Sequence, residues 1–103
     1  MTDATEKAEN ACTFLNLPMR FVLACKQITY ILLQVMESRS AETVAGVAIV
    51  MMLEQSYIEG MTLERVAEAL DILPWRIQSV LTKRGSFSWL NVKVAELVEG
   101  QSL

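Results

Sequence analysis

The sequence predicts a mainly α protein built as a single domain. Apolar residues recur at three- and four-residue spacing through most of residues 18–84, the period of helices that bury one side. Of the 103 residues, 52% are hydrophobic and 20% are charged, with only four Gly and two Pro, which is typical of a globular chain. We expect residues 1–17 to form an N-terminal arm, with the start of a loose helix over Met1–Ala11 as the alternative. Residues 18–56 are expected to form apolar helices, 62–84 a pair of shorter helices, and 85–103 a terminal hairpin or helix.

The composition argues against an enzyme. The chain lacks histidine, which removes the commonest general base and the commonest metal ligand. Its two cysteines, Cys12 and Cys25, are too few for a metal site, and no carboxylate cluster completes one. We therefore expect no catalytic residue, no metal and no cofactor. The thiols are expected to be free and partly buried, with a redox switch that joins them as the weaker alternative.

No apolar stretch has the character of a membrane span. Phe21–Met36 includes Lys26, and Val44–Leu53 is shorter than the roughly 20 residues that a bilayer requires. The start, Met1–Asn10, is polar and acidic, unlike a secretory signal or a transit peptide. We expect a cytoplasmic protein without a membrane partner.

The first long helix is expected to begin at Pro18 and to end near Met36. Apolar residues also lie off its main stripe, namely Leu23, Tyr30, Ile31 and Leu33. A helix that is apolar around so much of its circumference is buried on more than one side. A partner subunit supplies the second side most simply, because twofold dimers are the commonest oligomers, and a central core helix of a monomer is the alternative. The residues expected to mediate dimerisation are Phe21, Cys25, Ile28 and Leu32.

Three further helices have recognisable starts. Ser40 is a good N-cap for an apolar helix over Ala41–Gln55. Thr62 is the expected N-cap of a helix over Leu63–Leu70. After a short break, a proline suits the first turn of a last helix over Pro74–Arg84.

The last two of these helices resemble the helix-turn-helix of bacterial transcriptional regulators, over residues 62–84. That motif has a small residue where its helices cross, and Ala67 has this position. Its turn usually contains glycine, here replaced by Asp71, which tolerates the left-handed conformation better than most residues. The aliphatic residues inside its second helix are matched by Ile77 and Val80.

The segment after Gly85 is similar to the wing of winged-helix repressors of the MarR or Rrf2 kind. Phe87 and Trp89 alternate with serines, as they would in a strand. The resemblance implies a short C-terminal β-hairpin. A short helix capped by Asn91 and Gly100 is the alternative.

The distribution of charge favours a nucleic-acid partner more than the net charge of −3 does. Residues 72–94 contain Arg76, Lys83, Arg84 and Lys93 and no acidic residue, and phosphate binding requires such a positive surface. The resemblance implies double-stranded DNA, with the second helix of the motif in the major groove. The residues expected to bind it are Thr62, Trp75, Arg76, Gln78, Ser79, Thr82, Lys83 and Arg84.

Position along that helix suggests how these residues divide their roles. Arg76, near the N-terminal end, is expected to contact guanine, and Gln78 or Ser79 to hydrogen-bond bases. Later on the helix come residues expected to contact phosphates, namely Thr82, Lys83 and Arg84. For Trp75, a contact with the sugar-phosphate backbone and a half-buried anchoring role are equally open. For the basic residues, a solvated charged surface is the alternative.

The leading hypothesis is a dimeric transcriptional repressor that reads a palindromic site, with half-sites about one helical turn apart. A helix-turn-helix used for protein binding, as in an adaptor or anti-repressor, is the alternative that the acidic balance favours. A plasmid or phage DNA-segregation protein is a third hypothesis, because the same fold can bind DNA repeats without controlling transcription.

Overall fold

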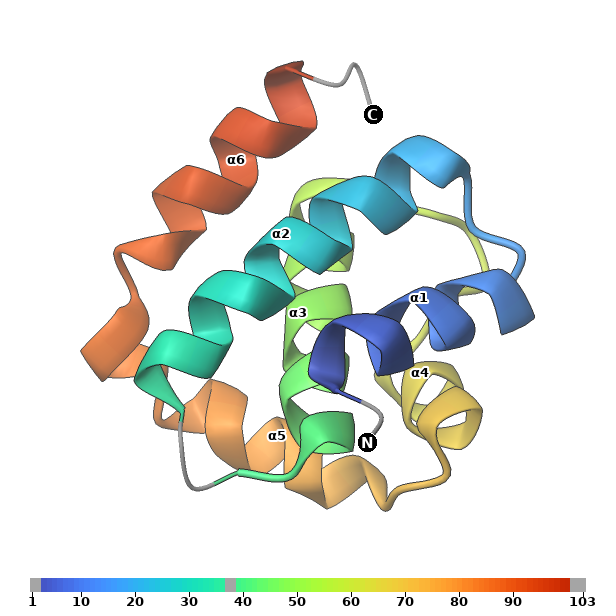
Figure 1. Cartoon of the computed structure of the whole chain (residues 1–103), viewed down its shortest axis with the longest axis horizontal. Coiled ribbons are helices and arrows are strands. Elements are labelled where there is room, and N and C mark those ends of the chain that lie inside the picture. The colour runs from blue at the N-terminus through green and yellow to red at the C-terminus, as the bar shows by residue number, and fades with distance from the viewer. Residues whose placement is uncertain (1–2, 37–38, 101–103) are drawn as a thin grey trace.

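The computed structural model describes residues 3–36 and 39–100, which form six α-helices and one short 3₁₀ helix (Figure 1). The elements are α1 (Ala4–Phe14), α2 (Met19–Val35), α3 (Ala41–Gln55), α4 (Leu63–Leu70), α5 (Pro74–Thr82), η1 (Arg84–Phe87) and α6 (Leu90–Gly100). The predicted mainly α class is thus confirmed. None of these helices combines the length and the apolar character needed to cross a bilayer.

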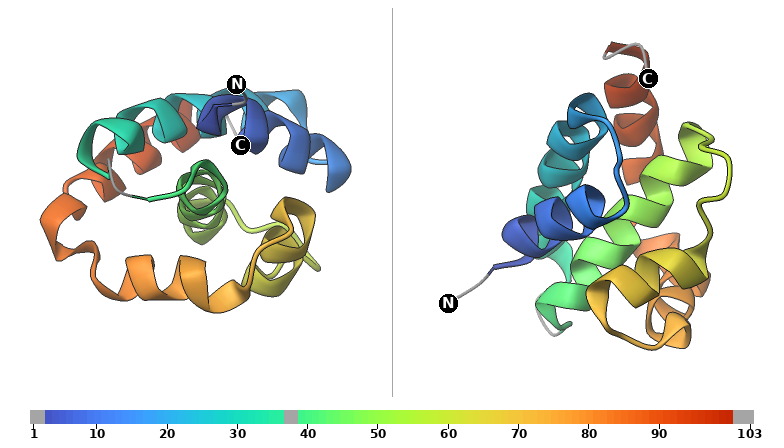
Figure 2. Two further views of the ribbon diagram at one scale, coloured as in Figure 1. Left: turned by 60° about the horizontal axis from the view of Figure 1, so that its bottom comes forward. Right: turned by 90° about the vertical axis from the view of Figure 1, so that its right-hand side faces the viewer.

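The helices are arranged around α3, as Figure 2 shows. On one side of α3 lie α1, α2 and α6, and on the other lie α4 and α5. Every residue of α3 from Thr43 to Met52 is buried, so this helix, not α2, is surrounded on all sides. Its predicted start is confirmed, because the Ser40 hydroxyl accepts a hydrogen bond from the backbone N–H of Thr43 at 3.2 Å.

A glycine in the middle of α3 makes room for the α4–α5 pair. A Cβ atom placed on Gly46 would lie 2.6 Å from Cδ1 and 2.8 Å from Cγ1 of Ile77 on α5. It would also lie 3.2 Å from Cδ1 of Leu70 on α4. Since real Cβ atoms essentially never come within 3.0 Å of other heavy atoms, a larger residue at this position would force the buried Ile77 side chain to shift.

The N-terminal segment, predicted as an arm, is the packed helix α1. The Asp3 side chain caps it by accepting from the backbone N–H of Glu6 at 2.9 Å. One side is buried through Ala4, Ala8, Ala11 and Cys12, at helical spacing. Small side chains allow close packing but carry a weak hydrophobic signal, which is why the composition of this segment suggested an arm.

The apolar stripe of α2 is buried inside the chain itself. Phe21, Cys25, Ile28 and Leu32 are each 0% exposed. Side chains with no accessible surface have none to offer to a partner subunit. The dimerisation role predicted for these four residues is therefore revised to a core role.

The C-terminal segment forms a helix where the wing was expected, and residues 3–36 and 39–100 include no strand. Phe87 is buried whereas Trp89 is exposed, so the two aromatics do not share a face as they would in a strand. Beyond them, Leu90, Val94 and Val98 form a buried stripe at four-residue spacing, the period of a helix. The helical alternative is thus confirmed, although α6 begins at Leu90 and includes Asn91.

Candidate functional site

The α4–α5 pair is held together by local signals that the sequence carries. The Thr62 hydroxyl caps α4 by accepting from the backbone N–H of Arg65 at 3.2 Å, as predicted. The turn begins at Asp71, whose φ of 57° is left-handed, as anticipated for the residue in the usual glycine position. The N–H of Ile72 then donates to the Ala67 carbonyl at 3.0 Å, which closes the end of α4 in a Schellman motif.

Burial divides α5 into an inner and an outer face. Ile77, Val80 and Leu81 are buried against the rest of the chain. Six of the eight residues predicted to bind DNA lie on the outer face or at its C-terminal end: Trp75, Arg76, Gln78, Ser79, Thr82 and Lys83. All six are exposed except Ser79, which is half-buried. The structure therefore presents them on one continuous surface, because the period of the helix brings them to the same side.

The two remaining predicted residues do not belong to α5. Thr62 is exposed at the start of α4, where its hydroxyl oxygen already serves as the cap. Arg84 follows the end of α5, which stops at Thr82 and not at Arg84 as predicted, and belongs to η1. Its side chain lies outside the part of the structure that is described.

An arginine and a tryptophan define the N-terminal end of the α5 surface. The guanidinium carbon of Arg76 lies 5.3 Å from the centre of the Trp75 ring, a cation–π contact. The ring is 59% exposed, which argues against the half-buried anchoring role considered for it. Because the two side chains support each other, Arg76 is partly ordered before any ligand arrives.

A small pocket beside Arg76 adds residues that the sequence reasoning missed. Its volume is about 140 Å³, and its walls combine the start of α3 with the start of α5. We call it the arginine pocket, and its lining residues are Arg39, Ser40, Thr43, Trp75, Arg76 and Ser79. In the sequence, Arg39 stands next to Ser40, the expected N-cap of a helix. Backbone N–H groups at the start of a helix favour anions, and this neighbourhood was the only sequence signal for an anion-binding role of Arg39 and Ser40.

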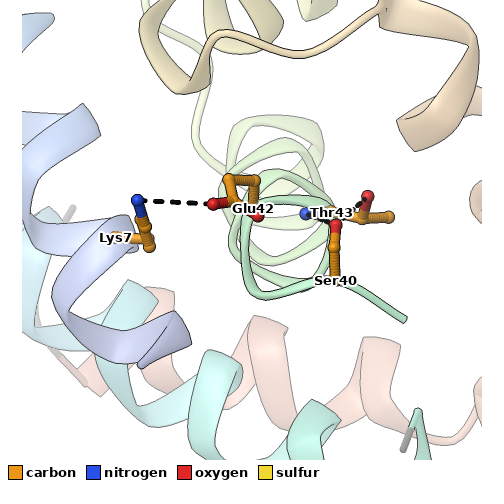
Figure 3. Close-up of polar contacts among 4 residues, drawn as sticks. All are labelled: Lys7, Ser40, Glu42 and Thr43. Carbon is orange, nitrogen blue, oxygen red and sulfur yellow. Dashed lines mark hydrogen bonds and ion pairs between the residues drawn. The ribbon is translucent and has the colours of Figure 1, made fainter. Parts of the chain in front are cut away.

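A wider depression adjoins the arginine pocket, because Ser40 and Arg76 line both. It measures about 650 Å³, and its apolar lining comes from Leu70, Ile72 and Leu73 at the turn between α4 and α5. Across it, the Lys7 ammonium of α1 lies 3.3 Å from the Glu42 carboxylate of α3 (Figure 3). The Glu42 pKa lies below its usual value because its own backbone N–H and then Lys7 stabilise the carboxylate. Glu42 thus offsets the charge of Lys7, whereas Arg76 shares the depression with the carboxylate of Asp71 and the arginine pocket with Arg39.

Acidic residues border the site on the α4 side. Glu64 and Glu68 are exposed on the outer face of α4, with Arg65 between them. A polyanion is therefore attracted to α5 and repelled by most of α4. Guanidinium groups and hydroxyls hold anions by hydrogen bonds, so the arginine pocket is suited to an anionic group.

The two cysteines lie outside this site. Cys12 of α1 and Cys25 of α2 are both free and 0% exposed. Burial, followed by a hydrogen bond with Cys12, raises the pKa of the Cys25 thiol well above its usual value. Because the thiolate is the reactive form, both features suppress thiol chemistry.

We expect neither cysteine to react with Ellman's reagent in the native protein. Both should react rapidly after unfolding in guanidinium chloride, when burial no longer protects them. The absorbance of the released thionitrobenzoate measures the number of reacted thiols. Rapid release from the folded protein would contradict this expectation and revive the redox alternative.

The chain matches no protein-family model, no curated protein and no solved structure. Fold and site therefore define it only as a small all-α protein whose α5 surface is basic, aromatic and exposed.

Proposed function

We propose that this chain is a sequence-specific DNA-binding regulator of transcription, in which α4 and α5 act as a helix-turn-helix. The observation that carries the proposal is the outer face of α5, which presents Trp75, Arg76, Gln78, Ser79, Thr82 and Lys83 together and no acidic residue. The left-handed turn at Asp71 and the burial of Ala67, the small residue expected where the two helices cross, agree with what such a motif requires.

The proposed binding mode inserts α5 into the major groove. The guanidinium of Arg76 donates two hydrogen bonds to the O6 and N7 atoms of a guanine, and Gln78 or Ser79 reads a neighbouring base. Arg39, which lines the arginine pocket with Arg76, is well placed for a backbone phosphate beside the groove. Lys83, at the C-terminal end of α5, contacts a second phosphate.

A gel-shift experiment tests the proposal. The wild-type protein is titrated against DNA from upstream of its own gene and against scrambled DNA of equal length, at low salt. We expect tighter binding to the upstream fragment, and binding that fades steeply as salt is added, because few basic residues hold the phosphates. Equal or absent binding to both fragments at low salt would contradict the proposal.

Lys83→Ala is expected to weaken binding to cognate and random DNA alike. The side chain contributes a phosphate contact and no base contact in the proposed mode, so the slope of log K against log salt should fall by about one unit. Fluorescence anisotropy at several salt concentrations measures both quantities. A loss confined to cognate DNA would show that Lys83 reads a base and would reverse the division of roles.

A second candidate function, protein binding, is favoured by the 650 Å³ depression. Exposed Leu73 and Trp75 beside Arg76 suit a partner that offers an apolar side chain next to an acidic one. Leu73→Ser separates the two candidate functions, because it removes apolar surface from the depression and leaves every proposed DNA contact in place. If α5 binds DNA, the affinity of this variant for DNA should equal that of the wild type.

A further inference from the structure

The outer side of the α1–α2 hairpin carries apolar residues that nothing in the chain covers. On α2, Met19, Leu23 and Tyr30 are 66%, 48% and 62% exposed. They belong to a row at alternating spacings of four and three residues, which we call the α2 seam: Met19, Leu23, Lys26, Tyr30 and Leu33. This alternation is the spacing by which one helix packs along another. This row is distinct from the stripe that α2 buries in the core, although Leu33 at its end is partly buried against that core.

A cavity opens beside the middle of the seam. It measures about 430 Å³ and lies between the start of α1, at Thr5, and the middle of α2. Lys26 and Tyr30 belong both to its lining and to the seam. The same face therefore offers both protruding apolar side chains and a mostly apolar cavity. A surface that packs against its own copy about a twofold axis must be complementary to itself in this way.

The charges of this face complement themselves. Helix α2 contains Arg20 and Lys26 and no acidic residue, whereas α1 begins with Asp3 and Glu6. Lys26 already lies 3.7 Å from Glu9 of α1. The two helices run in roughly opposite directions, so the start of α1 lies toward the middle of α2 and away from the start of α2 (Figure 1).

We propose that a second copy of this chain docks on this face, with the two α2 helices antiparallel about a twofold axis near Lys26. This register pairs Met19 with Leu33 of the other copy and Leu23 with Tyr30 of the other copy. Leu23 then faces the cavity beside the partner's Tyr30, and Arg20 faces the acidic start of the partner's α1. Each Lys26 lies near the axis, where its own Glu9 offsets its charge.

The position of this interface determines what the dimer does with DNA, a consequence that rests on the proposed function. Helix α3 separates the α1–α2 layer from α4 and α5 (Figure 2). The protomer measures 32 × 28 × 25 Å, so each α5 surface lies about a protomer's thickness from the axis, on opposite sides of the dimer. Reading two half-sites of one palindrome needs both helices on one side, about 34 Å apart. The dimer instead holds two separate DNA segments, one at each end.

The first test measures the mass of the full chain by light scattering at micromolar concentration. We expect the mass of two chains for the wild type and of one chain for Leu23→Glu, with the circular dichroism spectrum unchanged. Tyr57→Glu, a matched change of a residue that lies between α3 and α4 and is 83% exposed, should remain dimeric. Arg20→Glu and Glu6→Arg should each weaken the dimer, and the double variant should restore it. A monomeric wild type, or a dimer indifferent to Leu23→Glu, overturns the proposal.

The second test asks whether one dimer holds two duplexes. A biotinylated duplex of random sequence is fixed to beads at low salt, and capture of a second, fluorescent duplex is measured. Wild type should capture it, whereas Leu23→Glu should bind the fixed duplex and capture nothing above beads without protein. Wild type that binds the fixed duplex as a dimer without capturing a second overturns the bridging. If no variant binds DNA, the proposed function fails, and the mass measurements still decide the interface.

Discussion

Gly46→Val is expected to lower the free energy of unfolding by about 3 kcal/mol and Tm by roughly 12–24 °C. The Cβ atom would meet Cδ1 and Cγ1 of Ile77 at less than 3.0 Å, and Ile77 is itself 0% exposed, so the strain falls within the core. Gly46→Ala is expected to cost less, because overpacking of about 1–3 kcal/mol is partly offset by the roughly 1 kcal/mol that alanine gains over glycine in a helix. Denaturation followed by circular dichroism measures both.

Two further variants show whether the contact with Ile77 is the cause. Gly100→Ala, in α6, adds a methyl group where no atom lies within 4 Å, and should change stability by less than about 0.5 kcal/mol. Ile77→Val removes Cδ1, the atom closest to the new methyl group. Gly46→Ala should therefore cost less in the Ile77→Val background than in the wild type. If the stability costs of Gly46→Ala and Ile77→Val were strictly additive, the proposed clash between the new methyl group and Ile77 would be contradicted.

Arg76→Ala is expected to weaken binding to cognate DNA by about 5- to 150-fold, which corresponds to about 1–3 kcal/mol. The variant loses the proposed bidentate base contact and the cation–π partner of Trp75. It also loses one of the two positive charges of the arginine pocket, and Arg39 keeps the other. Preference at one base pair should disappear as well. Anisotropy titrations against a set of single-base variants of the cognate site measure affinity and preference together.

Two controls separate specificity from charge. Arg76→Lys keeps the positive charge but loses the planar fork, so it should retain most affinity for random DNA and still lose the preference. Lys93→Ala removes an exposed charge from α6, in the layer on the other side of α3, and should leave DNA affinity unchanged. If Arg76→Ala binds both cognate and random DNA as the wild type does, the α5 surface is ordinary solvated surface, and protein binding becomes the leading function.

The sequence alone determined those features that depend on neighbours within about four residues. The bounds of α3 agree with the prediction because Ser40 caps its start, and the start of α4 agrees because Thr62 does the same. The outer face of α5 was predictable for a similar reason, since the helical period alone decides which side chains share a side. Asp71 adopted the expected left-handed conformation because the turn closes through hydrogen bonds to the preceding helix.

Only the tertiary structure decided what each apolar surface packs against. Periodicity says that one side of a helix is buried, but it does not say whether the chain or a partner covers it. The stripe of Phe21 and Ile28 was therefore assigned to a dimer although it faces the core, while the seam with Leu23 remains exposed. Arg39 likewise lines one pocket with Arg76 because α5 packs against α3, a contact between segments far apart in the chain. Such contacts follow from how whole helices pack, and no local pattern encodes them.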